Sequence, residues 1–418
     1  MQDRVLVIGG GAAGLMAAGR AAEMGAHVLL LEKTKRPGNK LRITGNGRCN
    51  LTNTRDVAGF IEHLTPADPF LRNAFARFFV QDLIAFFEAR GIPTITEPDG
   101  RVFPASANAQ HIVDALRDYC LEGGVRFRYN SPVDEIIVED GHVRGVRSGE
   151  TTIEARQVIL ATGGTSYPHT GSTGDGYRLA QRLGHRIAPI RPGLVPLVVD
   201  DPAIRSLQGL TLRDVRVALY RGERRLVEAT GDLLFTHFGV SGPVILSLSM
   251  HLEKDGEGPT RLILDTRPHM DEATLDDDLR QRLAAMGRAT VRTWLRSLVP
   301  NSFAEVIIAQ SGVPADRRTS TLSAKQRHTI RRLLKGFSMT VSGTRPMAEA
   351  MVTLGGVDCS EIAPRTMASR LVDELYFAGE IMDVAGDTDG YNLQIAFTTG
   401  RMAGEAVARA ILTETSKG

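Results

Sequence analysis

The chain has few cysteines, and none of them is paired at a redox or metal-binding spacing. It contains only Cys49, Cys120 and Cys359, an odd number, and no C-x-x-C sequence. A disulfide scaffold and a thiol–disulfide active site are therefore both unexpected. No histidine, cysteine and carboxylate residues cluster at the spacing of a metal site, so we expect no metal. Free cysteines fit a reducing cytoplasm, which is the compartment that we expect.

Long apolar runs, an excess of one charge and aromatic residues are also scarce. No run reaches the roughly 18 apolar residues that a transmembrane helix needs, and the four glycines within residues 4–18 argue against a signal peptide. The net charge is only +2, and aromatic residues make up 6% of the chain. We therefore expect neither a nucleic acid nor a membrane as partner, but a small-molecule substrate. The sequence does not set the oligomeric state.

The composition is that of a globular protein with more than one domain. With 418 residues, of which 42% are apolar and 23% charged, the chain is long enough for two or three domains. Composition changes after Pro189, and glycine-rich turns with buried strands return near the C-terminus. We therefore expect one domain over residues 1–189 and 346–418. Residues 190–345 should form an inserted substrate domain that combines a small β-sheet or barrel with helices.

A glycine-rich turn over residues 9–14 follows the first apolar strand and opens the first helix. In this G-x-G-x-x-G pattern, Gly9 allows a tight turn, Gly11 lets the backbone approach a pyrophosphate, and Gly14 lets the helix pack close to the strand. The N–H groups that begin the helix, at Ala12 and Ala13, are available to phosphate oxygens. The motif predicts dinucleotide binding.

An acidic residue stands at the end of the second strand, about 20 residues further on. Glu32 can accept hydrogen bonds from the hydroxyl groups of a ribose. A glycine-rich turn without a ligand is the alternative interpretation. Strand, helix and acid in this order favour a bound dinucleotide.

Further glycine-rich turns at distant strand ends favour FAD over NAD. Residues 161–164 end a strand after an antiparallel meander, and residues 375–380 end another near the C-terminus. A long ligand would use both, with its flavin held by the C-terminal segment. No second G-x-G-x-x-G follows a strand, which leaves NAD(P)H only as a transient donor. The residues expected to bind FAD are Gly9, Gly11, Ala12, Ala13, Gly14, Glu32, Lys33, Lys40, Thr44, Gly45, Asn46, Arg48, Cys49, Asn50, Val133, Ala161, Thr162, Gly163, Gly164, Asp175, Gly379, Glu380, Gly390, Asn392, Leu393 and Gln394.

Four sequence blocks resemble a known family. They are TGNGRCN at 44–50, GGTSYP at 163–168, TGDGY at 173–177 and GYNLQ at 390–394. They are similar to signature blocks of the aminoacetone-oxidase-like FAD-binding proteins, a group of NAD(P)/FAD-dependent oxidoreductases that includes a bile-acid reductase. The resemblance runs nearly end to end. It implies an α/β fold, with a Rossmann-like FAD-binding domain of the three-layer glutathione-reductase type and an inserted β-rich plus helical substrate domain. Glycine often precedes the last block in that family, whereas this chain has Asp389.

Several side chains of these blocks have candidate roles beside the cofactor. Arg48 could pair with the pyrophosphate or with the flavin, and a surface arginine on a hairpin is the alternative. Cys49 is expected to be a small buried residue and not a nucleophile. Asp175 could cap the helix that follows it. The N–H groups of residues 392–394 could stabilise negative charge on a reduced flavin.

His237 and Tyr391 are the candidate catalytic residues. His237 could act as a general acid, although a hydrogen-bonded structural histidine is the commoner case. We expect an FAD-dependent oxidoreductase of a small organic substrate, which oxidises an amine or alcohol or reduces an activated C=C bond with NAD(P)H. The alternatives are a flavin-binding module with a structural or redox-sensing role and an RNA-modifying flavoprotein. The last would need a concentrated basic patch, which the sequence pattern does not indicate.

Overall fold

The computed structural model describes residues 4–66, 69–252 and 257–415. Contacts within the chain divide it into two compact units. Unit 1 comprises residues 1–193 and 347–418, and unit 2 comprises residues 194–346. The second unit is thus an insertion into the first.

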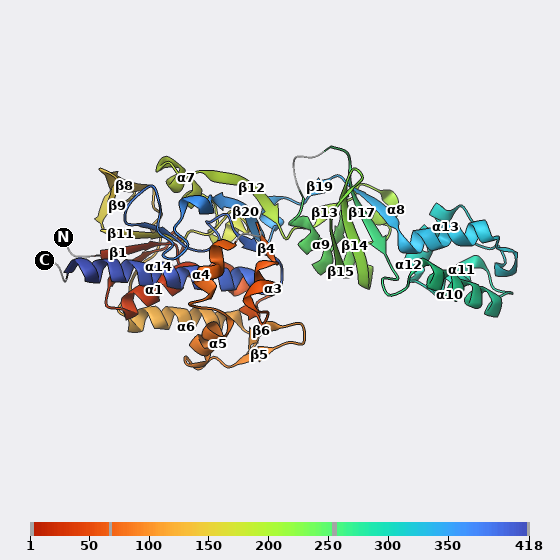
Figure 1. The fold of residues 1–418 in the computed structure, drawn as a ribbon, viewed down its shortest axis with the longest axis horizontal. Helices are drawn as coiled ribbons and strands as arrows, with labels where there is room; N and C mark the ends of the chain where they lie inside the picture. Colours follow the sequence, from red (N-terminus) through yellow and green to blue (C-terminus); the bar gives the residue numbers. More distant parts are fainter. Residues whose placement is uncertain (1–3, 67–68, 253–256, 416–418) are drawn as a thin grey trace. The chain divides into compact units, whose positions relative to one another are not determined.

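A five-stranded parallel sheet forms the centre of unit 1 (Figure 1). Apart from one edge strand with the sequence RFR, its strands are almost continuously apolar, which is typical of a sheet covered on both faces. The glycine-rich turns predicted from the sequence follow the carboxyl ends of three neighbouring strands of this sheet. In spatial order the strands are β21 (Leu375–Phe377), β11 (Gln157–Leu160), β1 (Arg4–Ile8), β2 (His27–Leu31) and β7 (Arg126–Arg128).

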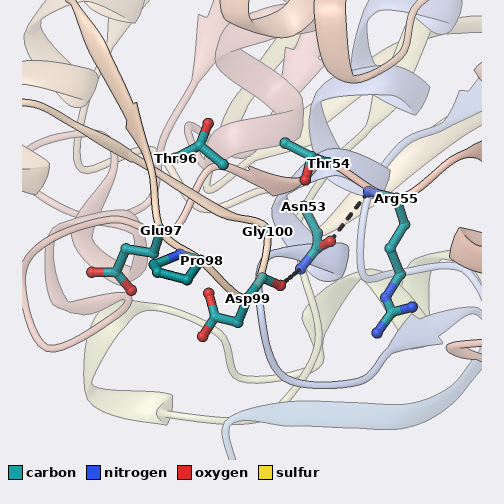
Figure 2. Close-up of a pocket in the computed structure, with 8 residues that line it drawn as sticks. All are labelled: Asn53, Thr54, Arg55, Thr96, Glu97, Pro98, Asp99 and Gly100. Carbon is teal, nitrogen blue, oxygen red and sulfur yellow. Dashed lines mark hydrogen bonds between the residues drawn. The ribbon is translucent and has the colours of Figure 1, made fainter.

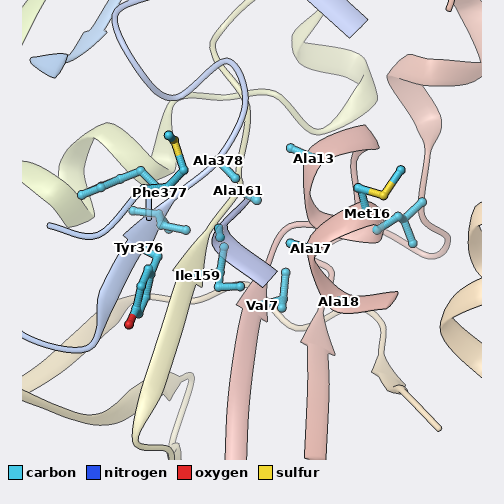
Figure 3. Close-up of a cluster of buried hydrophobic side chains, with 14 of the residues drawn as sticks. Val7, Ala13, Met16, Ala17, Ala18, Ile159, Ala161, Tyr376, Phe377 and Ala378 are labelled. Atoms are coloured by element: carbon cyan, nitrogen blue, oxygen red, sulfur yellow. The ribbon is translucent and has the colours of Figure 1, made fainter. Parts of the chain in front are cut away.

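Helix α1 packs beside this sheet and contacts two further helices of unit 1. These are α1 (Ala12–Glu23), α6 (Ala109–Glu122) and α14 (Tyr391–Thr415). Figure 3 shows the apolar cluster that joins α1 to the strands, with Ala17 of the helix and Val7, Ile159 and Phe377 of three strands all fully buried. The two ends of the chain therefore build one core.

Small residues allow α14 to lie very close to α1. A Cβ atom added to Gly400 would lie 2.3 Å from the carbonyl oxygen of Ala13, and one added to Gly404 would lie 2.5 Å from that of Ala17. Both contacts are with backbone, which cannot move aside cheaply. Glycine at these two positions therefore fixes the distance between the helices.

Smaller elements complete unit 1. The predicted antiparallel meander is present as a three-stranded sheet in the order β10-β9-β8, and the remaining strands form small antiparallel groups. The strands are β8 (Glu135–Glu139), β9 (His142–Ser148), β10 (Thr151–Glu154), β12 (Ile187–Gly193) with β20 (Val352–Val357), β4 (Leu64–Thr65) with β22 (Ala385–Gly386), and β3 (Thr52–Asn53), β6 (Arg101–Pro104) and β5 (Thr94–Thr96). The helices are α2 (Asn39–Ile43), α3 (Val57–Ile61), α4 (Arg72–Phe75), α5 (Val80–Glu88) and α7 (Asp175–Arg182).

Unit 2 combines a seven-stranded sheet with a group of helices (Figure 1). It has its own apolar core, in which Trp294, Phe303 and Phe337 are fully buried. The strands, in spatial order, are β18 (Phe337–Val341), β17 (Thr260–Asp265), β14 (Thr211–Arg221), β15 (Arg224–Thr236), β16 (Gly239–Ser241), β13 (Leu197–Val198) and β19 (Gly343–Thr344). The helices are α8 (Pro202–Arg205), α9 (Pro243–Ser249), α10 (Glu272–Ala285), α11 (Val291–Arg296), α12 (Asn301–Ser311) and α13 (Ala324–Lys335).

The predicted fold class is confirmed, and the differences lie at element boundaries. Apolar residues recur at helical spacing over 69–90, but the helix is broken near Phe79, where an extended backbone conformation caps α5. Residues 271–298 also have a helical pattern, which is broken between α10 and α11, where Thr290 caps the second helix. Helix α14 begins at Tyr391, directly after Gly390, whose φ of +99° ends the preceding loop.

Candidate functional site

The G-x-G-x-x-G turn has the close backbone approaches that its sequence predicts. Gly9 has φ +102°, and a Cβ atom there would lie 2.5 Å from the carbonyl oxygen of Ala161. A Cβ atom on Gly14 would lie 1.9 Å from the carbonyl oxygen of Gly9. Both glycines are therefore required by the packing of β1, β11 and α1 against one another.

Gly11 differs from its neighbours because open space surrounds it. It is the N-cap of α1, no side chain caps the helix, and the first turn carries no acidic residue. A Cβ atom on Gly11 would have no neighbour within 4 Å. Uncapped N–H groups at a helix N-terminus bind phosphate. The position thus fits the pyrophosphate of FAD, with Ala12 and Ala13 as the first N–H donors.

Glu32 anchors the opposite side of this turn. Its Oε2 accepts a hydrogen bond from the Gly10 N–H at 2.8 Å, and its Oε1 accepts one from the Thr34 N–H at 2.7 Å. The Thr34 hydroxyl also donates to Oε1 at 2.8 Å, so Oε2 is the carboxylate oxygen that keeps a second lone pair for a ribose hydroxyl. The Ser131 N–H donates to the Glu32 carbonyl oxygen, which brings the segment of the buried Val133 to the end of β2.

Three distant parts of the chain meet at Lys40. Its Nζ donates to Ser166 Oγ at 2.6 Å and forms an ion pair with Glu380 at 2.7 Å. Glu380 also accepts a hydrogen bond from the Thr353 N–H at 2.8 Å. Helix α2, the GGTSYP block and the loop after β21 are thereby joined.

Glycines bring the strand ends of this junction close together. A Cβ atom on Gly164 would lie 2.2 Å from Thr353 Oγ1, and one on Gly379, whose φ is +77°, would lie 2.8 Å from Ala13 Cβ. Ala161 is buried, and Thr162 Oγ1 is a buried hydroxyl without a partner among the described residues. Gly163 has φ +71°. These turns lie at adjacent carboxyl ends of parallel strands, where α/β folds bind ligands.

Asp175 opens α7 and pairs with Lys33 at the end of β2. Their ion pair measures 2.5 Å, and Lys33 also donates to Thr173 Oγ1. Partial burial raises the pKa of Asp175, but hydrogen bonds from Lys33, Thr173 and Arg178 outweigh it and lower that pKa to about 2. The helix cap is Gly174, without a side-chain bond, so Asp175 joins two segments and does not cap.

Asp175→Asn should destabilise the protein by about 1 kcal/mol at neutral pH, after allowance for solvent screening of this partly exposed pair. Because folding lowers the pKa of Asp175 from 3.8 to about 2, the carboxylate contributes stability above pH 3.8 and loses it as the pH falls toward 2. Urea unfolding of both proteins from pH 7 downward checks this. Asp118→Asn, at an exposed pair, is the control. A stability difference that persists unchanged at the lowest pH would contradict the prediction.

The loop from Thr44 to Asn50 is tightly folded. Gly45, Asn46, Gly47 and Cys49 all have positive φ. Cys49 is fully buried, and burial raises the pKa of its thiol, so the prediction of a small buried residue is confirmed. The Thr44 hydroxyl donates to the Lys40 carbonyl oxygen at 3.0 Å, which ties the loop to α2.

Arg48 and Asn50 of this loop make protein contacts. The Arg48 guanidinium pairs with Glu97 at 2.5 Å and lies over the Phe103 ring, 3.9 Å from its centroid. Asn50 is buried, and its amide, in the orientation that satisfies both ends, accepts a hydrogen bond from the Gly390 N–H at 3.0 Å. Arg48 is thus held at the β5–β6 hairpin, and its expected pairing with the cofactor stays a prediction.

The GYNLQ block shapes the loop before α14. Asn392 Oδ1 accepts from the Gly386 N–H at 2.8 Å, and its Nδ2 donates to the Gly386 carbonyl oxygen at 2.7 Å. Leu393 packs against the apolar core, and Gln394 is fully buried, with an Oε1 that lacks a partner among the described residues. The block therefore fixes the start of α14. That its N–H groups lie near the flavin stays a prediction.

Asp389 occupies a backbone conformation that favours glycine. Its φ is +80°, a conformation that glycine adopts without steric cost. Burial raises the pKa of its carboxyl; Arg101 opposes the rise, whereas Asp99 and Asp387 add to it. Its carbonyl oxygen accepts from Asn53 Nδ2 at 3.4 Å. The substitution therefore adds a strained acidic residue at the start of α14.

A cavity of about 540 Å³ lies beside this region. Figure 2 shows its lining, with Asn53, Thr54 and Arg55 on one side and the turn of residues 96–100 on the other. Burial raises the pKa of Tyr391, and the charge of the nearby Arg55 opposes the rise, so the first residue of α14 lies close to the cavity wall. The lining is polar, with a guanidinium, carboxylates and hydroxyls that could orient a polar substrate.

The two candidate catalytic residues lie in different units. Tyr391 is 2% exposed, stacks on His63 at 4.7 Å between ring centroids and meets Phe60 edge-on at 4.6 Å. His237 is exposed in the turn after β15 and contacts Phe238. The structure thus attaches Tyr391 to the FAD-binding unit, and a role for His237 stays a prediction.

Several residues of the site escaped the sequence analysis. Thr353 and Arg55 lie outside every motif, and only the tertiary structure brings them to Lys40's junction and to the cavity. Gly400 and Gly404 could have been found from the sequence, because two glycines four residues apart in a helix are typical of close helix packing.

Within residues 4–66, 69–252 and 257–415, no group of three or more His, Cys, Asp or Glu residues could hold a metal ion. Within the same ranges, no helix combines the length and the apolar character needed to cross a bilayer.

Comparison with known proteins identifies the family. The model of the HI0933-like protein Rossmann domain matches residues 3–406. A ribosomal RNA dihydrouridine synthase of Escherichia coli is 33% identical over 394 residues, 94% of this chain and 95% of that protein. A 3-dehydro-bile acid delta(4,6)-reductase of Clostridium scindens is 32% identical over 411 residues, 97% of this chain and 99% of that protein. A ribosomal RNA dihydrouridine synthase of Haemophilus influenzae is 30% identical over 410 residues, 97% of this chain and 98% of that protein.

The match and the site agree. The glycine turn at α1, Glu32 at the end of β2 and the returning C-terminal segment fit the phosphates, ribose and flavin of one FAD. The chain belongs to the HI0933-like family of Rossmann-domain proteins and is an FAD-binding, flavin-dependent oxidoreductase.

Proposed function

We propose that this protein reduces a C=C bond that is conjugated to a carbonyl group. The observation that carries the proposal is that the relatives align over almost the whole chain and their names share this chemistry. A dihydrouridine synthase saturates the C5=C6 bond of uracil, which is conjugated to C4=O. A delta(4,6)-reductase of a 3-dehydro bile acid acts on double bonds conjugated to the 3-oxo group. Both kinds of relative therefore act on a C=C bond conjugated to a carbonyl group, whereas their substrate molecules differ.

The reaction needs a hydride at the carbon β to the carbonyl and a proton at the α carbon. FAD, when bound, supplies hydride chemistry, and the protein supplies orientation and proton handling. In unit 1 the N-terminus of α1 and Glu32 would hold the nucleotide end, and the Lys40–Glu380 junction with the start of α14 would hold the flavin end. A donor to the carbonyl oxygen would activate the conjugated bond.

Arg55 is our candidate for that donor, with Tyr391 as the residue that positions it. Arg55 lines the cavity. Burial raises the pKa of Tyr391 to about 12, and the charge of the nearby Arg55 opposes the rise. The phenol therefore stays protonated at neutral pH and lies near the guanidinium.

Tyr391→Phe should leave FAD bound and slow substrate reduction about tenfold, since we propose that the phenol positions Arg55 during the reaction, and one hydrogen bond to a charged group contributes roughly 1.5 kcal/mol. The measurement is the rate at which a conjugated substrate reoxidises the reduced flavin, next to the rate of flavin reduction by NADPH, which should not change. Tyr220→Phe, in unit 2, is the matched control. An unchanged reoxidation rate in Tyr391→Phe would remove Tyr391 from this role.

NAD(P)H is the hydride donor that we propose. Only residues 9–14 carry a G-x-G-x-x-G after a strand, and the FAD site uses that turn. A nicotinamide would therefore bind transiently and leave before the substrate binds. The overall reaction consumes NAD(P)H and one proton and yields NAD(P)⁺ and the saturated product.

Anaerobic flavin spectroscopy tests the proposed function. The purified yellow protein is reduced with NADPH or NADH, and a 3-oxo-Δ4,6 bile acid or protein-free ribosomal RNA is then added. We expect rapid bleaching by one donor, return of the flavin colour with one substrate, and a product that has gained two hydrogens by mass spectrometry. Reduction of the flavin by an amine such as aminoacetone, with no reaction of either conjugated substrate, would instead support amine oxidation. No reduction by any donor would support a flavin-binding module.

A further inference from the structure

Positive charge is concentrated in one segment of unit 2. Residues 286–335 contain ten lysine and arginine residues but only two acidic ones, Glu305 and Asp316. The whole chain has a net charge of only +2, so the remainder is acidic. In the sequence, short basic groups such as Arg331, Arg332 and Lys335 are typical of an ordinary solvated surface. The net charge of the whole chain does not show that positive charge is concentrated in one segment.

Part of this charge is neutralised within the unit. Arg327 binds Asp276 of α10 at 3.0 Å, and Arg331 lies 3.1 Å from Glu272 of the same helix. Lys335 pairs with Asp265 at 2.6 Å. These three basic residues hold α13 against its neighbours, and the rest of the charge remains at the surface.

Backbone pairing brings two arginine-bearing segments of the chain side by side. Thr290 and Arg318 form an antiparallel bridge, and the Val291 N–H donates to the Arg317 carbonyl oxygen at 2.8 Å. The segment that precedes α11 therefore lies beside the segment that follows α12. We call the arginines of these two segments and of α11 the arginine cluster: Arg288, Arg292, Arg296, Arg317 and Arg318.

The arginine cluster has more positive charge than its acidic neighbours balance. Glu305 serves both Arg292, at 3.3 Å, and Arg296, at 2.9 Å. Arg288 and Arg318 are exposed and have no acidic partner among the described residues. Guanidinium groups of this kind bind phosphate oxygens in a two-pronged geometry.

The surface beneath the cluster is rigid and offers no ring for stacking. The segment's two aromatic residues, Trp294 and Phe303, are both 0% exposed in the core of unit 2. Single-stranded nucleic acid is usually held by exposed aromatic rings. Folded RNA is recognised by phosphates and shape, which an exposed arginine cluster on a packed helical support can supply.

We propose that the arginine cluster docks folded RNA through its phosphates. The proposal rests on the proposed function, for which it names the substrate class as a conjugated pyrimidine within structured RNA. An anionic membrane is a poorer match, because surface-binding helices also need exposed apolar residues. The exposed large apolar side chains of the described residues all lie outside 286–335. The cluster gives RNA affinity, and the chemistry stays in unit 1.

The test is RNA binding by a triple variant, Arg288→Gln with Arg296→Gln and Arg318→Gln, in the full-length FAD-loaded protein. With protein-free ribosomal RNA as probe, we expect affinity to fall roughly 10- to 100-fold at physiological salt, and the slope of log affinity against log salt to shrink by about 0.7–0.9 per lost phosphate contact. Asp316→Asn should act in the opposite direction and strengthen binding. Flavin reduction by NADPH should be unchanged in both.

The control removes three other exposed arginines, as Arg147→Gln with Arg205→Gln and Arg225→Gln. An equal loss of affinity in both triple variants would overturn the proposal, as would tighter binding of the wild type to poly-glutamate or to phosphatidylserine vesicles than to RNA. A preference for unstructured poly(U) over folded RNA would also contradict it. RNA binding is measured without a hydride donor. The binding result can therefore be interpreted even if the proposed reduction does not occur.

Discussion

Gly11→Leu should yield a folded but colourless protein. The side chain would meet no protein atom within 4 Å at its Cβ, so the fold should tolerate it. It would project into the space in front of the N-terminus of α1, where the pyrophosphate must approach the uncapped N–H groups. Loss of two charge-assisted hydrogen bonds, each roughly 1.5–3 kcal/mol, corresponds to an FAD affinity at least about 100-fold lower.

The measurement is the flavin-to-protein ratio after purification, followed by titration of the apoprotein with FAD. Gly343→Leu is the matched control, since Gly343 is also exposed, has no neighbour within 4 Å of a Cβ atom and lies in unit 2. It should retain its full flavin content. Wild-type flavin content in Gly11→Leu would mean that the pyrophosphate binds elsewhere, and the proposed cofactor site would have to be abandoned.

Gly404→Leu should destabilise the protein strongly, by about 3 kcal/mol or more, because overpacking a close helix contact forces backbone to move. The first atom of the new side chain would lie 2.5 Å from the Ala17 carbonyl oxygen. Helix α14 would have to separate from α1, and the loop before α14 would move with it. Thermal unfolding should show a midpoint roughly 5–10 °C lower, with loss of FAD as a second consequence.

Arg409→Leu is the control, which tests whether a new leucine elsewhere on α14 also destabilises the protein. It lies on the same helix with a largely exposed side chain, and its midpoint should stay close to that of the wild type. If Gly404→Leu unfolds at the wild-type temperature, the close packing of α1 and α14 does not hold unit 1 together. A Gly404→Leu protein that is as stable as the wild type but has lost FAD would show that the helix contact serves the cofactor alone.

The match between sequence and structure is best where a few neighbouring residues decide the conformation. The strand–turn–helix–strand unit that the glycine turn and Glu32 predict is present as β1, α1 and β2. Its glycines act within the turn itself, and its strands are short apolar runs. Cys49 was likewise predicted as buried, because no activating partner stands near it in the sequence.

Two side chains have distant partners that the sequence pattern did not indicate. Arg48 is in a cofactor-like block, yet its guanidinium pairs with Glu97 across the β5–β6 hairpin. Asp175 looked like a helix cap and is instead the partner of Lys33, 142 residues away. In both cases the side chain has several possible partners, and the fold selects one.

The basic segment of unit 2 illustrates the same point for charge. In the sequence, its arginines are spread over fifty residues and mix with helix-forming neighbours. Antiparallel pairing at Thr290 and Arg318 brings two of these stretches together, and acids of α10 neutralise others. Charge density is a property of the folded surface, and net charge alone cannot give it.

The sequence by itself determined the dinucleotide turn, the acidic residue beside it and the α/β class, because turn geometry and hydrophobic periodicity depend on residues a few positions apart. Only the tertiary structure decided that Lys40 meets Glu380, that Gly404 lies against Ala17 and that Arg288 lies near Arg318. Such contacts join residues tens to hundreds of positions apart. Each one depends on the packing of every element between its partners, and no local pattern encodes that packing.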